Sequence, residues 1–139
     1  SFLVNLFGKY LKLIFIIYIN IILLYNKNMD NDFHKKQIEK SFDYALVGIK
    51  RGGGPFGCII CDSSSGIIVG KGHNMVPIHN DPTQHAEIVA IRDACHYYNN
   101  FDLSCCTLYT SCEPCPMCLG AIYWAKINTI FYCAIKSLL

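Results

Sequence analysis

The sequence predicts an α/β fold in which helices cover both faces of a mixed β-sheet. Residues 56–72 contain two short apolar runs separated by a turn rich in Ser and Gly, a pattern typical of a β-hairpin. Beyond this hairpin, apolar runs of strand length alternate with helical patterns. A hairpin followed by alternating helices and strands favours a layered sheet with helices on each side.

The first expected helix precedes the hairpin, and Asp30 or Asp32 is placed to cap its start. One face of this helix is apolar and consists of Ile38, Phe42, Ala45, Leu46 and Ile49. The helix ends at the run Gly-Gly-Gly-Pro of residues 52–55. Strands follow at 56–61 and 67–72, with a turn between them, and a loop is expected over 73–82.

The remaining chain predicts two helices and two strands. The second helix begins near residue 85, ends at Asn99-Asn100 and has an apolar face formed by Ile88, Ile91, Cys95 and Tyr98. A strand at 106–110, a helix at 115–125 and a strand at 127–134 complete the pattern. Tyr123 and Trp124, near the end of the third helix, are expected in the core.

Basic charge is concentrated at the start of the chain. The chain has 12 Lys and Arg against 10 Asp and Glu, but three of the lysines and none of the acids lie in residues 1–28. Residues 29–139 therefore carry a formal net charge of −1. A domain of this charge lacks the basic surface expected of a nucleic-acid-binding protein, so a small-molecule substrate is favoured.

We divide the chain into an apolar leader over 1–28 and one domain over 29–139. The uninterrupted apolar core of the leader, Leu13–Ile19, is shorter than the roughly 20 residues that a membrane span needs. Membrane association is therefore expected only if the leader is retained as an anchor. The alternative is that the leader is upstream sequence and that translation starts at Met29.

The nine cysteines are odd in number and include the adjacent pair Cys105-Cys106, which suits a disulfide framework poorly. This pattern favours reduced thiols, used for metal binding and packing, in a cytoplasmic protein. The spacing of Cys58 and Cys61 is interpreted as strand packing.

Two short segments contain the residue types of a zinc site: His85-Ala86-Glu87 and Pro114-Cys115-Pro116-Met117-Cys118. One imidazole and two thiolates supply three ligands of a tetrahedral zinc and leave the fourth position for water, as in catalytic sites. Cys112 also has a suitable spacing, so Cys112 and Cys115 remain an alternative pair. A closed structural site on His85 and all three cysteines is the other alternative.

Glu87 is the candidate proton shuttle. Residues 85 and 87 would point about 200° apart in the middle of a helix, so they share a site only at an irregular helix start. Cys115 and Cys118 are three residues apart and face the same way on one helical turn. The start of their helix is expected to lower the pKa of both thiols.

Four parts of the chain together form a family pattern: Gly-Gly-Pro-Phe-Gly at 53–57, Asn74, Asp-Pro-Thr-Gln-His-Ala-Glu at 81–87, and the long segment 109–125. This pattern resembles the cytidine-deaminase-like superfamily and, within it, the small zinc-dependent guanine deaminases most closely. The tRNA adenosine deaminases share Asp-Pro-Thr and His-Ala-Glu but typically lack Gly-Gly-Pro-Phe-Gly and the Gly-Ala-Ile-Tyr-Trp of residues 120–124.

The resemblance implies a three-layer α/β/α sandwich around a five-stranded sheet. It implies one zinc per chain on His85, Cys115 and Cys118, with Glu87 as the proton shuttle. The implied reaction is the hydrolytic deamination of guanine to xanthine and ammonia. The resemblance also implies a homodimer, with Ile122, Tyr123 and the C-terminal tail as candidate contacts.

The resemblance further implies a pocket for a nucleobase. Asn74 would hydrogen-bond the base ring, Phe56 would stack on it, and Ala86 would offer a backbone N–H. Trp124 would help to form the wall of the pocket.

Members of this family continue beyond the fourth strand with a fifth strand and C-terminal helices, whereas this sequence ends at Leu139. We therefore expect a deaminase domain that is truncated at its C-terminus. Two further functional hypotheses remain at this stage. The chain is a cytosine, nucleoside or tRNA adenosine deaminase of the same superfamily, or a catalytically inactive zinc-binding remnant.

Overall fold

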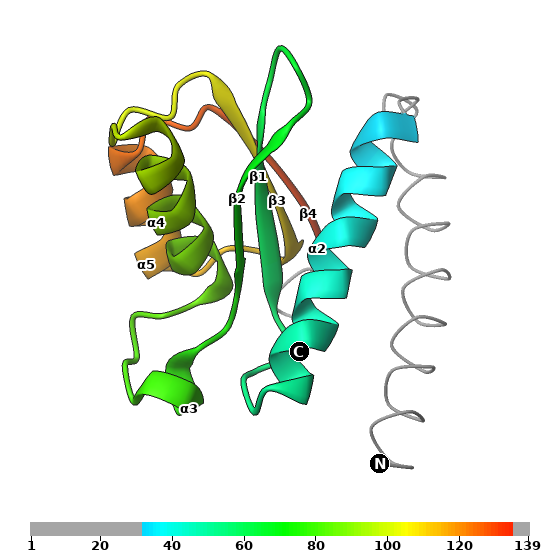
Figure 1. The fold of residues 1–139 in the computed structure, drawn as a ribbon, viewed down its shortest axis with the longest axis vertical. Helices are drawn as coiled ribbons and strands as arrows, with labels where there is room; N and C mark the ends of the chain where they lie inside the picture. Colours follow the sequence, from blue (N-terminus) through cyan, green and yellow to red (C-terminus); the bar gives the residue numbers. More distant parts are fainter. Residues whose placement is uncertain (1–31, 135–139) are drawn as a thin grey trace.

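The computed structural model describes residues 32–134 (Figure 1). In chain order its elements are α2 (Asp32–Lys50), β1 (Gly57–Asp62), β2 (Ile68–His73), α3 (Val76–His79), α4 (Ala86–Tyr98), β3 (Cys106–Cys112), α5 (Pro116–Trp124) and β4 (Thr129–Ala134). The strands form one sheet in the order β2-β1-β3-β4. β1 runs antiparallel to β2 and to β3, whereas β3 and β4 are parallel. The predicted mixed sheet is confirmed.

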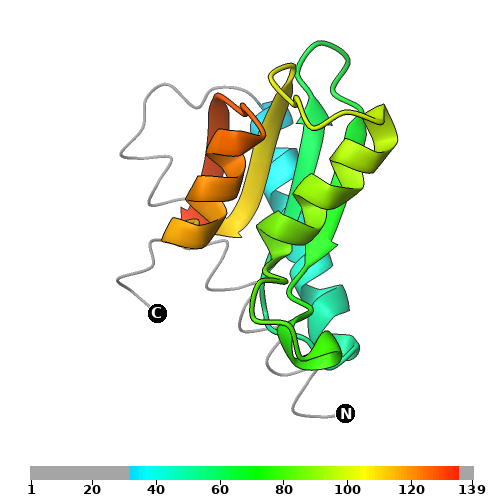
Figure 2. The ribbon, with the colours of Figure 1, turned by 90° about the vertical axis from the view of Figure 1, so that its left-hand side faces the viewer.

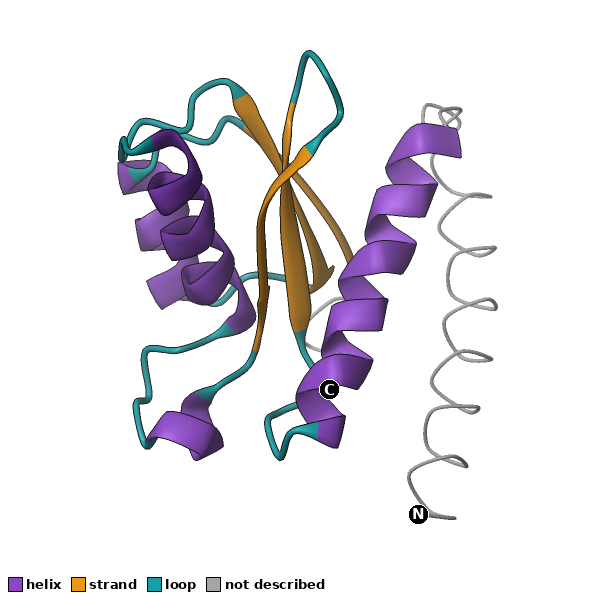
Figure 3. Cartoon of the chain, viewed as in Figure 1, coloured by secondary structure: helices purple, strands orange, loops and turns teal. Residues whose placement is uncertain are grey.

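Helices cover both faces of this sheet, as predicted. Figures 1 and 3 show α2 on one face and α4 with α5 on the other. Turned by 90°, α4 and α5 lie side by side in front of the strands (Figure 2). The hairpin and the alternating elements were predicted with boundaries within two residues of those observed, but the expected loop over 73–82 contains the short helix α3.

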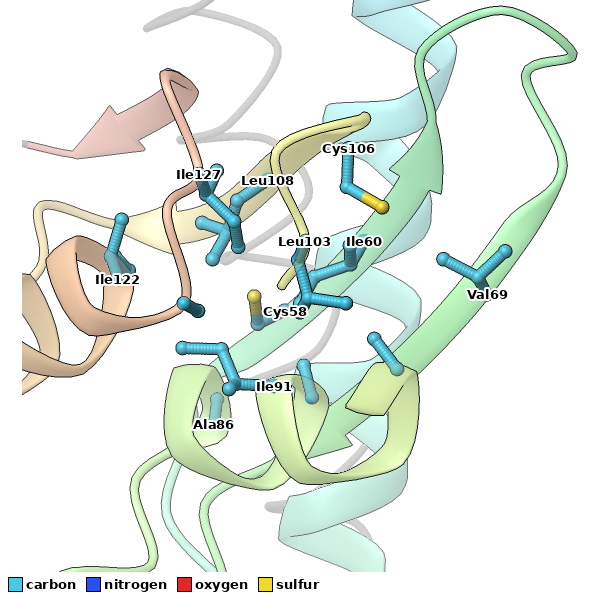
Figure 4. Close-up of a cluster of buried hydrophobic side chains, with 13 residues drawn as sticks. Cys58, Ile60, Val69, Ala86, Ile91, Leu103, Cys106, Leu108, Ile122 and Ile127 are labelled. Carbon is cyan, nitrogen blue, oxygen red and sulfur yellow. The ribbon is translucent and has the colours of Figure 1, made fainter. Parts of the chain in front are cut away.

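The core lies on both sides of the sheet because alternate residues of a strand point to opposite faces. Cys58 and Ile60 of β1 pack toward α4 and α5, whereas Ile59 and Cys61 pack toward α2. Figure 4 shows the first of these clusters, with Leu108 of β3 beside Ile127 and with Ile91 of α4 on the other side of the cluster. The Cys58/Cys61 spacing therefore reflects strand packing, as interpreted.

The expectation that Tyr123 and Trp124 are core residues is wrong. Each is 75% exposed, because they occupy the outward side at the end of α5. Ile122, named as a candidate dimer contact, is instead buried in the core at 3% exposure.

Two predictions concern residues outside the described part of the chain. These are the nature of the leader over 1–28 and the truncation beyond the fourth strand. Between residues 32 and 134, no helix has the length and apolar character needed to cross a membrane.

Candidate metal centre and pocket

Two helix starts bring the zinc half-motifs together. His85 is the residue before α4 and has extended backbone angles (φ −67°, ψ 159°). Cys115 occupies the same position before α5, with φ −71° and ψ 167°. Neither side chain caps its own helix, although such a position commonly uses its side chain for that purpose. Both side chains are therefore left to meet each other.

The distances among these side chains fit a zinc ion. The Sγ atoms of Cys115 and Cys118 each lie 3.6 Å from Nδ1 of His85, and the three ligand atoms all lie within 4.8 Å of one another. Tetrahedral zinc with usual Zn–S and Zn–N bond lengths separates a sulfur from a nitrogen by about 3.6 Å. The His/Cys/Cys set therefore matches zinc in both donor chemistry and spacing.

Cys112 does not join this group. Among the described residues, the metal-ligand cluster consists of His85, Cys115 and Cys118 only. Cys112 is the last residue of β3 and lies in the wall of the neighbouring pocket. The geometry thus favours the three-ligand set over the Cys112/Cys115 pair and over a closed four-ligand site.

The expected lowering of the thiol pKa by the helix start is not found for Cys118. Burial raises the pKa of this thiol well above its usual value, and the nearby carboxylate of Glu87 raises it further. Cys118 is fully buried, so desolvation outweighs the attraction of the α5 N-terminus. A cation is needed to hold this sulfur as a thiolate.

Glu87 lies beside the cluster, in the first turn of α4, and is 6% exposed. Its Oε2 atom is 3.4 Å from Sγ of Cys118. Its Oε1 atom accepts a hydrogen bond of 3.1 Å from the hydroxyl of Thr110. This arrangement agrees with the prediction that residues 85 and 87 meet at an irregular helix start. The backbone of His85 is still extended, so its side chain does not follow the helical spacing that would turn it away from Glu87.

The loop that leads into α4 is held by a carboxylate. Asp81 accepts hydrogen bonds from the backbone and the hydroxyl of Thr83 and from the amide of Gln84. These bonds, those from Thr83 first, lower the pKa of Asp81 to about 2. The backbone N–H of His85 donates to the carbonyl of Thr83. The Asp-Pro-Thr segment therefore orients the histidine.

A pocket of about 300 Å³ opens beside this cluster. Its lining residues are Phe56, Asn74, His85, Ala86, Glu87, Cys112 and Glu113. Phe56 and Asn74 meet because the N–H of Asn74 donates to the carbonyl of Phe56, where β1 begins and β2 ends. The pocket is at the small end of the range for ligand sites.

The side chain of Asn74 has a defined orientation. Its Oδ1 atom accepts a hydrogen bond of 3.1 Å from the N–H of Val76 at the start of α3. Because a backbone N–H can only donate, the oxygen must face Val76. The amide N–H groups are therefore the part of Asn74 that is left for a ligand.

The structure does not bring Trp124 to this pocket. Trp124 is the last residue of α5, is 75% exposed and is not among the lining residues. It lies six residues beyond Cys118, which corresponds to about 9 Å along a helix. The lining also includes Glu113, which sequence reasoning did not select, although its place directly before Pro114-Cys115 was a usable signal.

This mixed sheet and its His/Cys/Cys cluster belong to one known domain family. A sequence profile of the family described as "Cytidine and deoxycytidylate deaminase zinc-binding region" matches residues 31–134. The chain belongs to this family, as its motifs indicated.

Within the family, the chain is similar to guanine deaminase from Bacillus subtilis, with 49% identity over 102 residues. That match covers 73% of this chain and 64% of the relative. The X-ray structure of the Bacillus subtilis guanine deaminase superposes with a TM-score of 0.71 and 48% identity, covering 75% of this chain and 66% of that one. The fold is therefore the one found in that relative, of whose length this chain spans about two thirds.

Two other proteins show the range of the similarity. A probable cytosine deaminase from Schizosaccharomyces pombe is 43% identical over 101 residues, which cover 68% of this chain and 60% of that protein. A protein solved in complex with 2,6-diaminopurine has a TM-score of 0.72 and 29% identity, and the match covers 75% of this chain and 58% of that one.

Proposed function

We propose that this chain catalyses the hydrolytic deamination of guanine to xanthine and ammonia. One zinc per chain would be held by His85, Cys115 and Cys118. The observation that carries the proposal is the placement of the buried Glu87 between this cluster and the small pocket. The similarity to guanine deaminase supports guanine as the substrate.

In the proposed reaction, water adds to ring carbon C2 of guanine and the exocyclic amine leaves as ammonia. Zinc, when bound, supplies a water that is acidic enough to react at neutral pH. Glu87 takes one proton from the attacking water and passes it to the adjacent ring nitrogen. It then takes the remaining proton from the oxygen now bonded to C2 and gives it to the exocyclic amine, so that the C–N bond breaks and the C2 carbonyl forms as ammonia leaves. Its Oε2 atom is the oxygen on the side of the cluster, 3.4 Å from Sγ of Cys118.

The proposed contacts to the base use the other lining residues. The Asn74 amide donates to an acceptor of the ring, because its oxygen is occupied by Val76. Phe56 lines the pocket, and in this proposal its ring stacks on the base. Ala86, the first residue of α4, has a backbone N–H without a partner inside the helix. These groups suit a flat base with several acceptors, as guanine is.

Cytosine is the second candidate substrate. A probable cytosine deaminase is 43% identical to this chain over 101 residues, which supports cytosine as the alternative base. A tRNA substrate fits poorly, since residues 29–139 carry a formal net charge of only −1. An inactive remnant would bind zinc and release no ammonia from any base.

We also propose a cytoplasmic homodimer. None of the nine cysteines, all within the described residues, forms a disulfide, and a reducing compartment preserves that state. Apolar side chains are exposed along α5 and include Leu119, Tyr123 and Trp124. Sedimentation equilibrium of the purified chain tests the dimer, and a monomer at micromolar concentration would refute it.

Ammonia release tests the function. The 139-residue chain, loaded with zinc, is incubated separately with guanine, cytosine, adenine, guanosine and cytidine. We expect release from guanine far above that from the other four. Preference for cytosine would replace the proposed substrate, and no release from a folded protein that contains zinc would support the inactive remnant.

A further inference from the structure

Glu87 depends on one neighbour outside the zinc half-motifs. Thr110 lies on β3 and is 1% exposed, and its hydroxyl donates to Oε1 of Glu87 at 3.1 Å. The strand is fixed on both sides, because residue 110 pairs with Cys58 of β1 and with Tyr132 of β4. The hydroxyl is therefore presented from a rigid part of the fold.

The two oxygens of the Glu87 carboxylate have different surroundings. Oε1 accepts a hydrogen bond from Thr110, whereas Oε2 accepts one of 3.4 Å from the thiol of Cys118. That thiol loses its proton when it binds a metal, so only the hydrogen bond to Oε1 persists in the zinc-loaded protein. The other acceptor near the Thr110 hydroxyl is the carbonyl of Gly57, which is farther away at 3.5 Å. The Thr110 hydroxyl therefore donates its proton to Oε1 of Glu87 in preference to the Gly57 carbonyl.

We infer that Thr110 is a positioning residue that holds Oε1 and leaves Oε2 as the oxygen that exchanges protons with water and substrate. This inference rests on the proposed deaminase function. A glutamate side chain has several rotatable bonds and loses considerable entropy when it is held in one conformation. A hydrogen bond from a fixed strand supplies that restraint before the substrate arrives.

Because Glu87 is buried, the loss of its hydrogen bond from Thr110 is costly. In the described part of the chain, no buried side-chain nitrogen or oxygen lacks a hydrogen-bond partner. Replacing Thr110 with Val keeps the shape of the side chain but removes the donor to Oε1. A buried carboxylate oxygen without its partner is unfavourable, so the carboxylate is expected to rotate toward another donor.

The test compares three variants of the zinc-loaded chain with the wild type. Thr110→Val should lower kcat for guanine about tenfold to a hundredfold, as a small misplacement of a catalytic group does. KM and zinc content should stay within about twofold, because neither is set by this hydrogen bond. Thr110→Ser keeps the hydroxyl and should restore most of kcat.

Thr107→Val is the matched control. Thr107 lies on the same strand, is also buried at 6% exposure, and bonds to the hydroxyl of Ser63 at 2.8 Å instead of to the site. This control removes a buried hydroxyl from β3 without touching Glu87. We expect it to lower stability but leave kcat unchanged.

Crystal structures of the wild type and of Thr110→Val provide a readout that does not need turnover. The inference predicts a rotated or multiply placed Glu87 carboxylate in the variant. An unchanged carboxylate, or a kcat equal to that of the wild type, would overturn it. Loss of zinc from Thr110→Val alone would also overturn it, because Thr110 would then support the metal centre. If the wild type deaminates no base, the proposed function fails, and the carboxylate position alone decides the role of Thr110.

Discussion

Gly72→Ala tests how the packing of α4 on the sheet sets the geometry of the metal centre. Gly72 lies on β2 beneath the start of α4. A Cβ atom at this position would lie 2.4 Å from the carbonyl oxygen of Ala86 and 2.6 Å from the nitrogen of Ala90. Ordinary contact begins at 3.4 Å, so the helix must move away from the sheet by about 1 Å.

This displacement has two expected consequences. Overpacking of a tight contact costs about 1–3 kcal/mol of folding stability, which corresponds to roughly 4–8 °C in Tm per kcal/mol for a domain near 100 residues. The start of α4 also carries His85, whose Nδ1 lies 3.6 Å from both thiol sulfurs. If the shift costs about 1.4 kcal/mol at the metal centre, zinc affinity falls about tenfold.

Thermal unfolding and zinc competition with a chromophoric chelator measure the two effects. Gly120→Ala is the control, because a Cβ there meets nothing within 4 Å and should stabilise the α5 helix by up to about 1 kcal/mol. Gly70→Ala presses on Ala90 and Ala94, farther along α4, so it should lower Tm with a smaller loss of zinc affinity. Wild-type Tm and zinc affinity in Gly72→Ala would show that the packing argument is mistaken.

Three other predictions concern the cysteines. Cys118→Ser should reduce zinc content to background while Cys112→Ser retains it, and equal zinc loss in both variants by atomic absorption would point to a four-ligand site. Burial raises the pKa of Cys61 and of Cys133 to about 11. The unfolded chain therefore loses these protons first, so Tm should be steady from neutral pH to about pH 8.5 and fall as the pH rises toward 11. A Tm that stays constant to pH 10.5 would contradict this. In the zinc-loaded protein, a thiol reagent should modify the exposed Cys105 before the buried cysteines, and peptide mapping that finds another residue first would disagree with the structure.

The fold was predictable because its signals are local. The apolar run of β1 is buried on both faces, so its continuous hydrophobicity indicated a central strand. The helix starts at His85 and Cys115 were marked by proline and by the spacing of the motif residues. Family resemblance added the identity of the metal-ligand set, which spacing alone had left open between Cys112 and Cys118.

The parts that were missed depend on burial and on contacts distant in sequence. The pKa of Cys118 was expected to fall with the helix start, but burial, which spacing does not reveal, dominates. Thr110 resembles any β-branched strand residue until its hydroxyl is seen beside Glu87, 23 residues away. Trp124 was assigned to the pocket by resemblance, yet in this chain it stands exposed at the end of α5.

The most direct test follows the conversion of guanine to xanthine by the zinc-loaded 139-residue chain, with Glu87→Gln measured beside it at equal zinc content. We predict steady xanthine formation by the wild type and, in the variant, a loss of about 10²-fold or more, the scale of general acid–base catalysis. Wild-type turnover together with near-normal turnover in Glu87→Gln would contradict the assignment of Glu87 as the proton shuttle. Absence of xanthine from the folded, zinc-containing wild type would contradict the proposed deamination of guanine itself.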